Sequence, residues 1–242
     1  MRSLLRLLAL LLLSLVCLQI WFALRIALMN VLAPQSTAFQ RSEMLRLAVE
    51  KHSIAWSQDG VADEALSRNL KRAVIASEDA DFVNHGGVEW DAIEKAREKN
   101  QKAEARAEKL SSRSAKPVQA KIRGASTISQ QLAKNLFLSG ERNLPRKGQE
   151  LVITLMLEAL LSKQRILDIY LNNVEWGEGL FGAQAAARNY FRTNASQLSP
   201  NQAARLAVML PAPKYFEKRA GSGYILGRAA TIEARMPAVE IP

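Results

Sequence analysis

The feature that most constrains this chain is a long apolar stretch near its N-terminus. Residues 7–24 are apolar except for Ser14 and Gln19, and a run of 18 such residues reaches the length at which a helix can cross a bilayer. Arg2 and Arg6 precede the run, which favours a cytoplasmic N-terminus. We therefore expect a chain that is anchored in a membrane and folds outside it.

A cleaved secretory signal is the alternative interpretation of this leader. Its apolar region would be unusually long, and the residues before Pro34 form a poor cleavage context. We expect the leader to be retained. Cys17 is the single cysteine of the chain, which excludes an internal disulfide, and we expect it to be a passive, buried thiol within the leader. The predicted organisation is a cytoplasmic N-terminus and anchor over 1–25, a linker and membrane-proximal segment over 26–55, and one globular domain over 56–242.

The chain is strongly basic, with 33 Lys and Arg against 23 Asp and Glu and a formal net charge of +10. Such a balance indicates an anionic partner, which could be nucleic acid, a lipid headgroup or a phosphorylated substrate. Nucleic acid is disfavoured because the domain is expected to be exported and no aromatic-rich platform is visible. Residues 94–123 concentrate basic side chains; they are interpreted as a solvated helix followed by a loop, or as a basic segment against the membrane or a substrate groove.

Beyond the leader, apolar residues recur mainly at helical spacing, and alternating strand patterns are scarce. The glycines Gly177, Gly179 and Gly182 predict a tight loop between two helices. The sequence therefore predicts a mainly α-helical domain. The expected helical segments are 66–79, 152–161, 166–174, 183–190 and 201–210.

A first polar cluster surrounds Glu78, which is followed by Asp79, Phe82 and His85. Glu78 is expected at the C-terminal end of an apolar helix, where the helix dipole and partial burial both raise the proton affinity of a carboxylate. A carboxyl group with a raised pKa suits general acid or base chemistry near neutral pH. On this segment alone, a solvated acidic helix end with an ordinary loop histidine is the simpler interpretation.

A second cluster follows Gly124 and includes Ser126. Thr127 with Gln130 fits a capping box at the start of a helix whose apolar residues fall on one face. Amides beside a lysine suit the binding of sugar hydroxyls and phosphate, although an ordinary solvent-facing helix surface is the alternative. The polar side of this helix carries Gln130, Gln131, Lys134 and Asn135.

The third cluster is Arg146 and Lys147, directly after Pro145 at an expected helix start. Two cations in a first turn oppose the helix dipole, and a broken local rule suggests a functional site. With the free N–H groups of the helix end they could form a pyrophosphate cradle. The alternative is a simple ion pair between Lys147 and Glu150, which would contribute only about 0.2–0.5 kcal/mol.

Two acidic residues lie within the apolar helix that follows this cluster. Glu150, Thr154 and Glu158 fall on one stripe of the helix, so both carboxylates are expected to be at least partly buried. A buried acid needs a partner or a function.

Four motifs in this order and spacing resemble the peptidoglycan glycosyltransferases, glycosyltransferase family 51, over roughly residues 60–215. The chain is most similar to the monofunctional members of that family. It departs from the family at Asp81 and Glu89, and its insertion over 94–123 is longer and more charged. The matching segments are Glu78–Gly87, Gly124–Asn135, Arg146–Glu150 and Arg165–Asn172.

The resemblance implies a lysozyme-like, two-lobed helical domain around a cleft. It implies that Glu78 is the general base that takes the proton from the acceptor 4-hydroxyl of lipid II as this oxygen attacks C1 of the donor. The donor is a glycan strand on undecaprenyl pyrophosphate, and the configuration inverts. Glu150 would orient groups or assist departure, and Lys134, Arg142, Arg146 and Lys147 would hold the pyrophosphate. The other implied substrate-binding residues are Asp79, Phe82, His85, Ser126, Thr127, Gln130, Gln131, Asn135, Arg165, Tyr170 and Asn172.

The resemblance also indicates partners and a compartment. The expected partners are lipid II, the lipid-linked growing glycan and the bacterial inner membrane, with the domain in the periplasm. A divalent cation (Mg²⁺ or Mn²⁺) is compatible with the chemistry, although no dedicated carboxylate cage is visible. Transpeptidases or division proteins are further candidate partners, since no Ser-x-x-Lys motif occurs.

Two other functions remain open. A lysozyme-like hydrolase is disfavoured because the cleavage of a finished strand does not require a group of cations that binds pyrophosphate. A non-catalytic cell-wall scaffold is disfavoured because the acid of the first motif, Glu78, is present.

Overall fold

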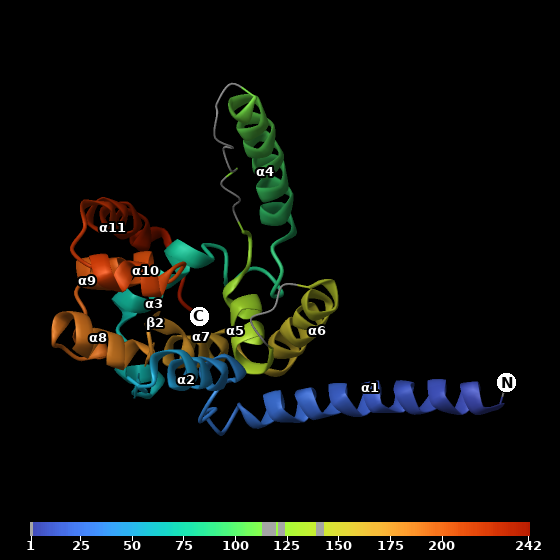
Figure 1. Cartoon of the computed structure of the whole chain (residues 1–242). Helices are drawn as coiled ribbons and strands as arrows, with labels where there is room; N and C mark the ends of the chain where they lie inside the picture. The colour runs from blue at the N-terminus through green and yellow to red at the C-terminus, as the bar shows by residue number, and fades with distance from the viewer. Residues whose placement is uncertain (1, 113–119, 121–123, 139–142) are drawn as a thin grey trace.

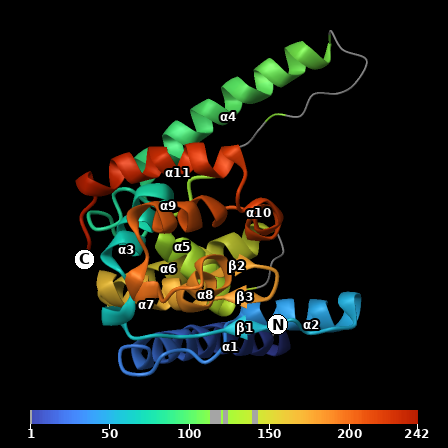
Figure 2. The same cartoon turned by 90° about the vertical axis from the view of Figure 1, so that its left-hand side faces the viewer.

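The computed structural model describes residues 2–112, 120, 124–138 and 143–242, and it is mainly helical with one small sheet (Figures 1 and 2). The predicted fold class is confirmed. The helices are α1 Arg2–Leu28, α2 Ala38–Lys51, α3 Arg68–Glu78, α4 Trp90–Ser111, α5 Ile128–Phe137, α6 Leu144–Leu160, α7 Lys163–Asn173, α8 Ala183–Phe191, α9 Pro200–Met209, α10 Pro213–Phe216 and α11 Gly223–Arg235. Short 3-10 turns are η1 Asp63–Ala65, η2 Ala195–Gln197, η3 Glu217–Arg219 and η4 Met236–Ala238.

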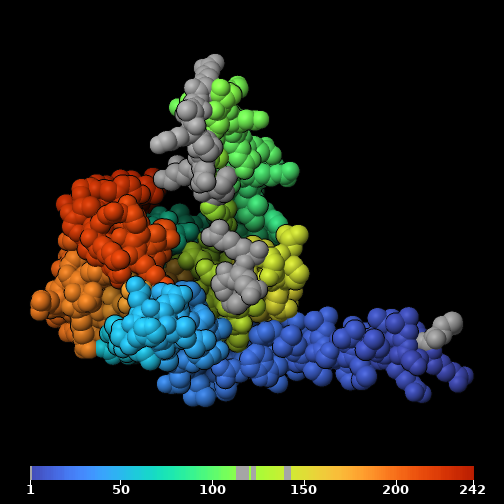
Figure 3. All heavy atoms as spheres, viewed as in Figure 1, coloured from blue at the N-terminus to red at the C-terminus, as the bar shows by residue number. Residues whose placement is uncertain are grey.

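The leader forms α1, which projects from the body as a single rod (Figures 1 and 3). It is long and apolar enough to cross a membrane. Its C-terminal end is docked on α6, where Phe22 and Ile26 are buried. Gln19 exchanges two side-chain hydrogen bonds of 3.0 Å with Gln149, which explains the polar residue within the apolar run. The prediction that Cys17 is buried is wrong for the protein alone, because Cys17 lies on the exposed surface of α1.

The segment predicted as a linker contains the helix α2. Thr37 and Gln40 form a capping box at its start, which is a local signal for a helix. The prediction of a linker did not include this helix. Arg46 of α2 donates to Glu178 at 2.6 Å, so the helix is tied to the body of the domain. The membrane-proximal segment is therefore an ordered part of the fold.

The helices form two groups around α7. One contains α3, α9 and α11, and the other contains α5 and α6 with the end of α1; α7 packs against α5, α6 and α8. The buried residues of both groups belong to one hydrophobic core. The charged helix α4 extends away from the body of the domain (Figures 2 and 3), and this confirms the predicted solvated helix. The loop that was expected after it falls largely outside the described residues.

The glycine-rich loop between α7 and α8 forms a short hairpin. Strand β2 (Glu175–Gly177) runs antiparallel to β3 (Leu180–Phe181), and β1 (Ser57–Gln58) pairs with β3 in parallel. Gly179 has a φ of +70°, and a Cβ there would lie 2.0 Å from the Ala55 carbonyl oxygen. The missing side chain of Gly179 thus lets the hairpin pack closely against the segment before β1.

Candidate active site

Glu78 is the last residue of α3 and faces α5. Its carboxylate accepts a hydrogen bond of 3.0 Å from the Gln131 side-chain amide. The carbonyl oxygen of that amide accepts in turn from the Tyr170 hydroxyl at 2.9 Å, and Tyr170 is completely buried on α7. Three helices therefore contribute to one chain of hydrogen bonds that orients the Glu78 carboxylate.

Burial is the main cause that raises the pKa of Glu78 above its usual value, because desolvation disfavours the charged carboxylate. The neighbouring charge of Asp79 also raises this pKa, while the hydrogen bonds from Gln131 and Ser77 oppose the shift. The predicted direction of the shift is confirmed. A carboxyl group in this state can exchange a proton with a bound hydroxyl group.

Asp79 connects the end of α3 to the start of α5. One carboxylate oxygen accepts from the backbone N–H of Ile128, the first residue of α5, at 2.9 Å. The other pairs with His85 Nε2 at 2.8 Å, and Nδ1 of the same ring accepts from the N–H of Gly87. Asp79 is the largest cause that raises the pKa of His85. In this structure Asp79 and His85 support the site through the backbone around it.

The loop between α3 and α4 is held by further buried contacts. Thr127 donates to the Gly87 carbonyl at 2.7 Å and forms the predicted capping box with Gln130. Lys163 donates to the His85 carbonyl at 2.6 Å and lies 4.5 Å from the centroid of the buried Phe82 ring. Sequence reasoning missed Lys163, because it begins α7, beyond the end of the helix that carries Glu158, and a spacing of five residues is not a helical pairing signal.

Glu158 finds the partner that a buried acid requires. It pairs with Lys163 at 2.9 Å and accepts a hydrogen bond from Ser129 on α5. This carboxylate therefore joins α6 to α5. The alternative of an ordinary solvent-facing surface on α5 is wrong, because the Gln130 and Asn135 side chains are buried. Of the polar residues predicted on this helix, Lys134 is exposed.

The first turn of α6 carries two cations that pair with a buried carboxylate one turn later. Asn143 caps the helix, and Pro145 occupies the second helical position, one later than predicted. Glu150 is 3% exposed and pairs with Arg146 at 2.8 Å and with Lys147. Two positive charges face one negative charge, so the cluster keeps a net charge of about +1. The Lys147 side chain is half exposed, which leaves it accessible to an anion.

A pocket of about 440 Å³ joins this cluster to the start of α5. Lys147, Ser126 and Gln130 line it together with the first half of α4. Gln130 is the neighbour of Gln131, the residue that holds Glu78. The first turn of α5 therefore contributes one residue to the pocket beside Lys147 and another to the support of Glu78.

Some predicted site residues lie elsewhere. Arg165 and Asn172 line a different pocket, where Arg165 pairs with Asp168 and Asn172 bonds both backbone atoms of Val61. They are not brought next to Glu78, and their substrate-binding role stays a prediction. Arg142 lies outside the described residues.

The described residues form no dedicated cage of ionisable side chains for a metal, and a Mg²⁺ or Mn²⁺ ion held in part by substrate phosphates stays a prediction. Within residues 2–112, 120, 124–138 and 143–242, no group of three or more His, Cys, Asp or Glu side chains is arranged to hold one. The nearest acids of the site, Glu78 and Asp79, are committed to Gln131, His85 and Ile128.

The comparisons with known proteins agree with this geometry. Residues 49–237 match the transglycosylase family, and the chain belongs to that family. It is 51% identical over 218 residues to the biosynthetic peptidoglycan transglycosylase of Paraburkholderia phytofirmans, covering 90% of this chain and 85% of the relative. The protein of the same name from Burkholderia pseudomallei is 52% identical over 224 residues, covering 93% and 82%. That from Bordetella pertussis is 48% identical over 223 residues, covering 92% and 85%.

Replacing Asp79 by Asn should lower the pKa of His85, because the Asp79 carboxylate is the main group that raises it. A raised histidine pKa contributes stability that is complete below the unfolded value, about 6.5, and is lost as pH rises through the folded pKa. Asp79→Asn should therefore reduce the free energy of unfolding more at pH of about 5.5 than at about 8.5. NMR titration of the two histidines and thermal unfolding at both pH values test this. An unchanged His85 titration would show that another group controls it.

Proposed function

We propose that this protein polymerises peptidoglycan glycan strands from lipid II and releases undecaprenyl pyrophosphate. The observation that carries the proposal is that the start of α5 contributes to both parts: its Gln131, supported by Tyr170, holds the Glu78 carboxylate, and its Gln130 lines the pocket that contains Lys147. Membership of the transglycosylase family and the names of the relatives support the substrate class.

Glu78 acts as the general base of this reaction. Its carboxylate takes the proton from the acceptor 4-hydroxyl while that oxygen forms a bond to C1 of the donor sugar. The bond between C1 and the pyrophosphate oxygen breaks on the opposite face, so the α configuration becomes β. The raised pKa of Glu78 supports this role, because a stronger base accepts the hydroxyl proton more readily.

Arg146 and Lys147 stabilise the leaving pyrophosphate, whose negative charge grows as the bond breaks. Glu150 lies beneath both cations and positions them through its two ion pairs. This assigns Glu150 a positioning role, in keeping with the expectation that it orients groups or assists departure. Lys134 and Arg142 remain predicted contributors to pyrophosphate binding.

The protein works at the bacterial inner membrane, with α1 as a single transmembrane anchor and the catalytic domain in the periplasm. The length and apolar surface of α1 support the anchor, and Arg2 and Arg6 support a cytoplasmic N-terminus. Anchoring confines the enzyme to the surface that contains its lipid-linked substrate. Transpeptidases or division proteins are the proposed partners, because polymerised strands still need to be crosslinked.

Glu78→Gln should lose about 10²–10⁴-fold in the rate of lipid II polymerisation, since general base catalysis typically contributes that much. Glutamine keeps the size of the side chain but cannot accept the proton. Glu240→Gln, which changes an exposed acid near the C-terminus, is the matched control and should polymerise normally. Near-normal activity of Glu78→Gln, measured as lysozyme-sensitive polymer on a gel, would refute the role of Glu78.

Lys147→Met should lower kcat/KM for lipid II by about 10²-fold, the typical loss when one group that stabilises developing negative charge is removed. Arg146 still pairs with Glu150 in this variant, so the fold of α6 should persist. Lys218→Met removes an equally exposed cation from η3 and should have no effect on turnover. If Lys147→Met and Lys218→Met had equal kcat/KM for lipid II, Lys147 would not bind the leaving pyrophosphate.

The orientation in the membrane can be tested with spheroplasts. External protease should digest the domain of the full-length protein, because the proposed topology leaves only the start of the chain in the cytoplasm. A cytoplasmic marker protein reports on membrane integrity. Protection of the domain in intact spheroplasts, followed by digestion after lysis, would overturn the periplasmic assignment.

A further inference from the structure

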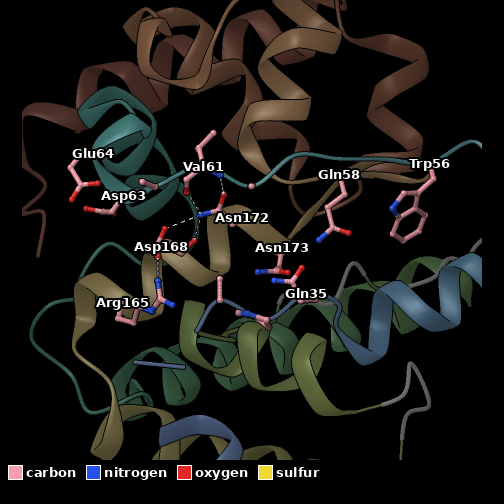
Figure 4. Close-up of a pocket in the computed structure, with 14 residues that line it drawn as sticks. Gln35, Trp56, Gln58, Val61, Asp63, Glu64, Arg165, Asp168, Asn172 and Asn173 are labelled. Carbon is pink, nitrogen blue, oxygen red and sulfur yellow. Dashed lines mark hydrogen bonds and ion pairs between the residues drawn. The ribbon is translucent and has the colours of Figure 1, made fainter. Parts of the chain in front are cut away.

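A second pocket, of about 830 Å³, is lined on one side by residues of α7 (Figure 4). Successive residues of an α-helix are about 100° apart, so Asn172, which lines this pocket, lies about 200° around α7 from Tyr170. The opposite wall consists of the chain after α1 and the segment 56–64. One helix thus separates two distinct sites.

Side-chain amides from three elements converge in this pocket. Gln35 comes from the connection after α1, Gln58 from β1 and Asn173 from the end of α7, and Figure 4 shows all three facing the same space. Among the described residues, the exposed Gln35 and the half-buried Gln58 make no side-chain hydrogen bond. The buried Asn173, by contrast, donates to the Ile169 carbonyl at 2.8 Å and accepts from Gln40. The Gln35 and Gln58 amides therefore each offer two N–H donors and one acceptor oxygen to a ligand.

Trp56 provides a flat aromatic surface at one end of the pocket (Figure 4). Its ring packs on Phe181, with a centroid distance of 4.7 Å and an angle of 32°. The indole is half-buried, so it is fixed by this contact and still borders the pocket. A fixed aromatic face can pack against the apolar face of a sugar ring.

The charges of the lining disfavour an anionic ligand. The pocket contains three carboxylates and one cation among its described residues. That cation, Arg165, is paired with Asp168 and donates to the Met29 carbonyl at 2.6 Å. Asp63 is paired with Lys71 at 2.7 Å, and Glu64 at the rim is exposed. A pyrophosphate would meet net negative charge here, in contrast to the pocket beside Lys147.

We propose that this pocket binds an uncharged stretch of N-acetylated glycan outside the polymerisation site. Hydroxyl and acetamido groups match the uncommitted amides of Gln35 and Gln58, and a sugar ring matches Trp56. The proposal rests on the proposed function because that function brings glycan to this protein. The ligand is either the strand that the enzyme makes or a strand of the finished wall.

The test uses the full-length protein in detergent micelles, labelled with 5-fluorotryptophan, and a soluble tetramer of N-acetylglucosamine. The chain has four tryptophans, and a Trp56→Phe variant assigns the ¹⁹F signal of Trp56. Ile93 lines the pocket beside Lys147, and Trp90 lies one helical turn before it on α4. The Trp90 signal in the same spectrum therefore reports on binding near that pocket. We expect a saturable shift of the Trp56 signal. Binding seen only at Trp90 would overturn the proposal.

Two substitutions sharpen the result. Gln58→Leu should weaken the binding seen at Trp56 about 2- to 10-fold, the effect of losing one or two hydrogen bonds to the ligand. Asn201→Ala, which removes an exposed amide on α9, should bind as the wild type does. Equal affinity of Gln58→Leu and wild type would overturn the pocket as the binding site.

The outcomes also separate this proposal from the catalytic one. Glu78→Gln should polymerise poorly yet still shift the Trp56 signal, whereas an active wild type without that shift would overturn the pocket alone. A shorter product from Gln58→Leu would identify the enzyme's own strand as the ligand. Weaker co-sedimentation with purified sacculi, at unchanged product length, would identify the finished wall.

Discussion

The whole site depends on one buried carboxylate, that of Asp79. It accepts from the first backbone N–H of α5 and pairs with His85, so it joins the end of α3, the following loop and the start of α5. An acid at a helix N-terminus satisfies an N–H group that has no partner within the helix. This contact holds the start of α5 beside the end of α3, where the Gln131 amide donates to Glu78.

Two acids of the site differ because their surroundings differ. Glu78 is buried with only neutral hydrogen-bond donors, so its proton affinity rises. Glu150 is buried beneath two cations, which compensate its charge and are positioned by it. In the proposed function the same residue type therefore supports proton transfer in one place and anion binding in the other, and the surroundings of each side chain separate the two roles.

Helix α7 connects the parts of the molecule. Its Tyr170 face supports the catalytic chain, while its Arg165 and Asn172 face holds the end of α1 and the segment before η1 through backbone contacts. The anchor is also docked on α6 through Gln19 and Ile26. The position of α1 relative to the rest of the domain is thus restricted by packing as well as by the covalent link.

The sequence by itself determined the anchor, the helical class, the capping box at Thr127 and the identity of Glu78 as the candidate base, because periodicity, caps and motif spacing are local properties. It did not predict α2 or the hairpin at Gly179, where the local signals were weak or misread. Only the tertiary structure decided that Tyr170 braces Gln131, that Glu158 needs Lys163, and that Arg165 and Asn172 face a separate pocket. Those relations join residues distant in the chain, and they depend on which faces of α5, α6 and α7 meet once apolar surface is buried.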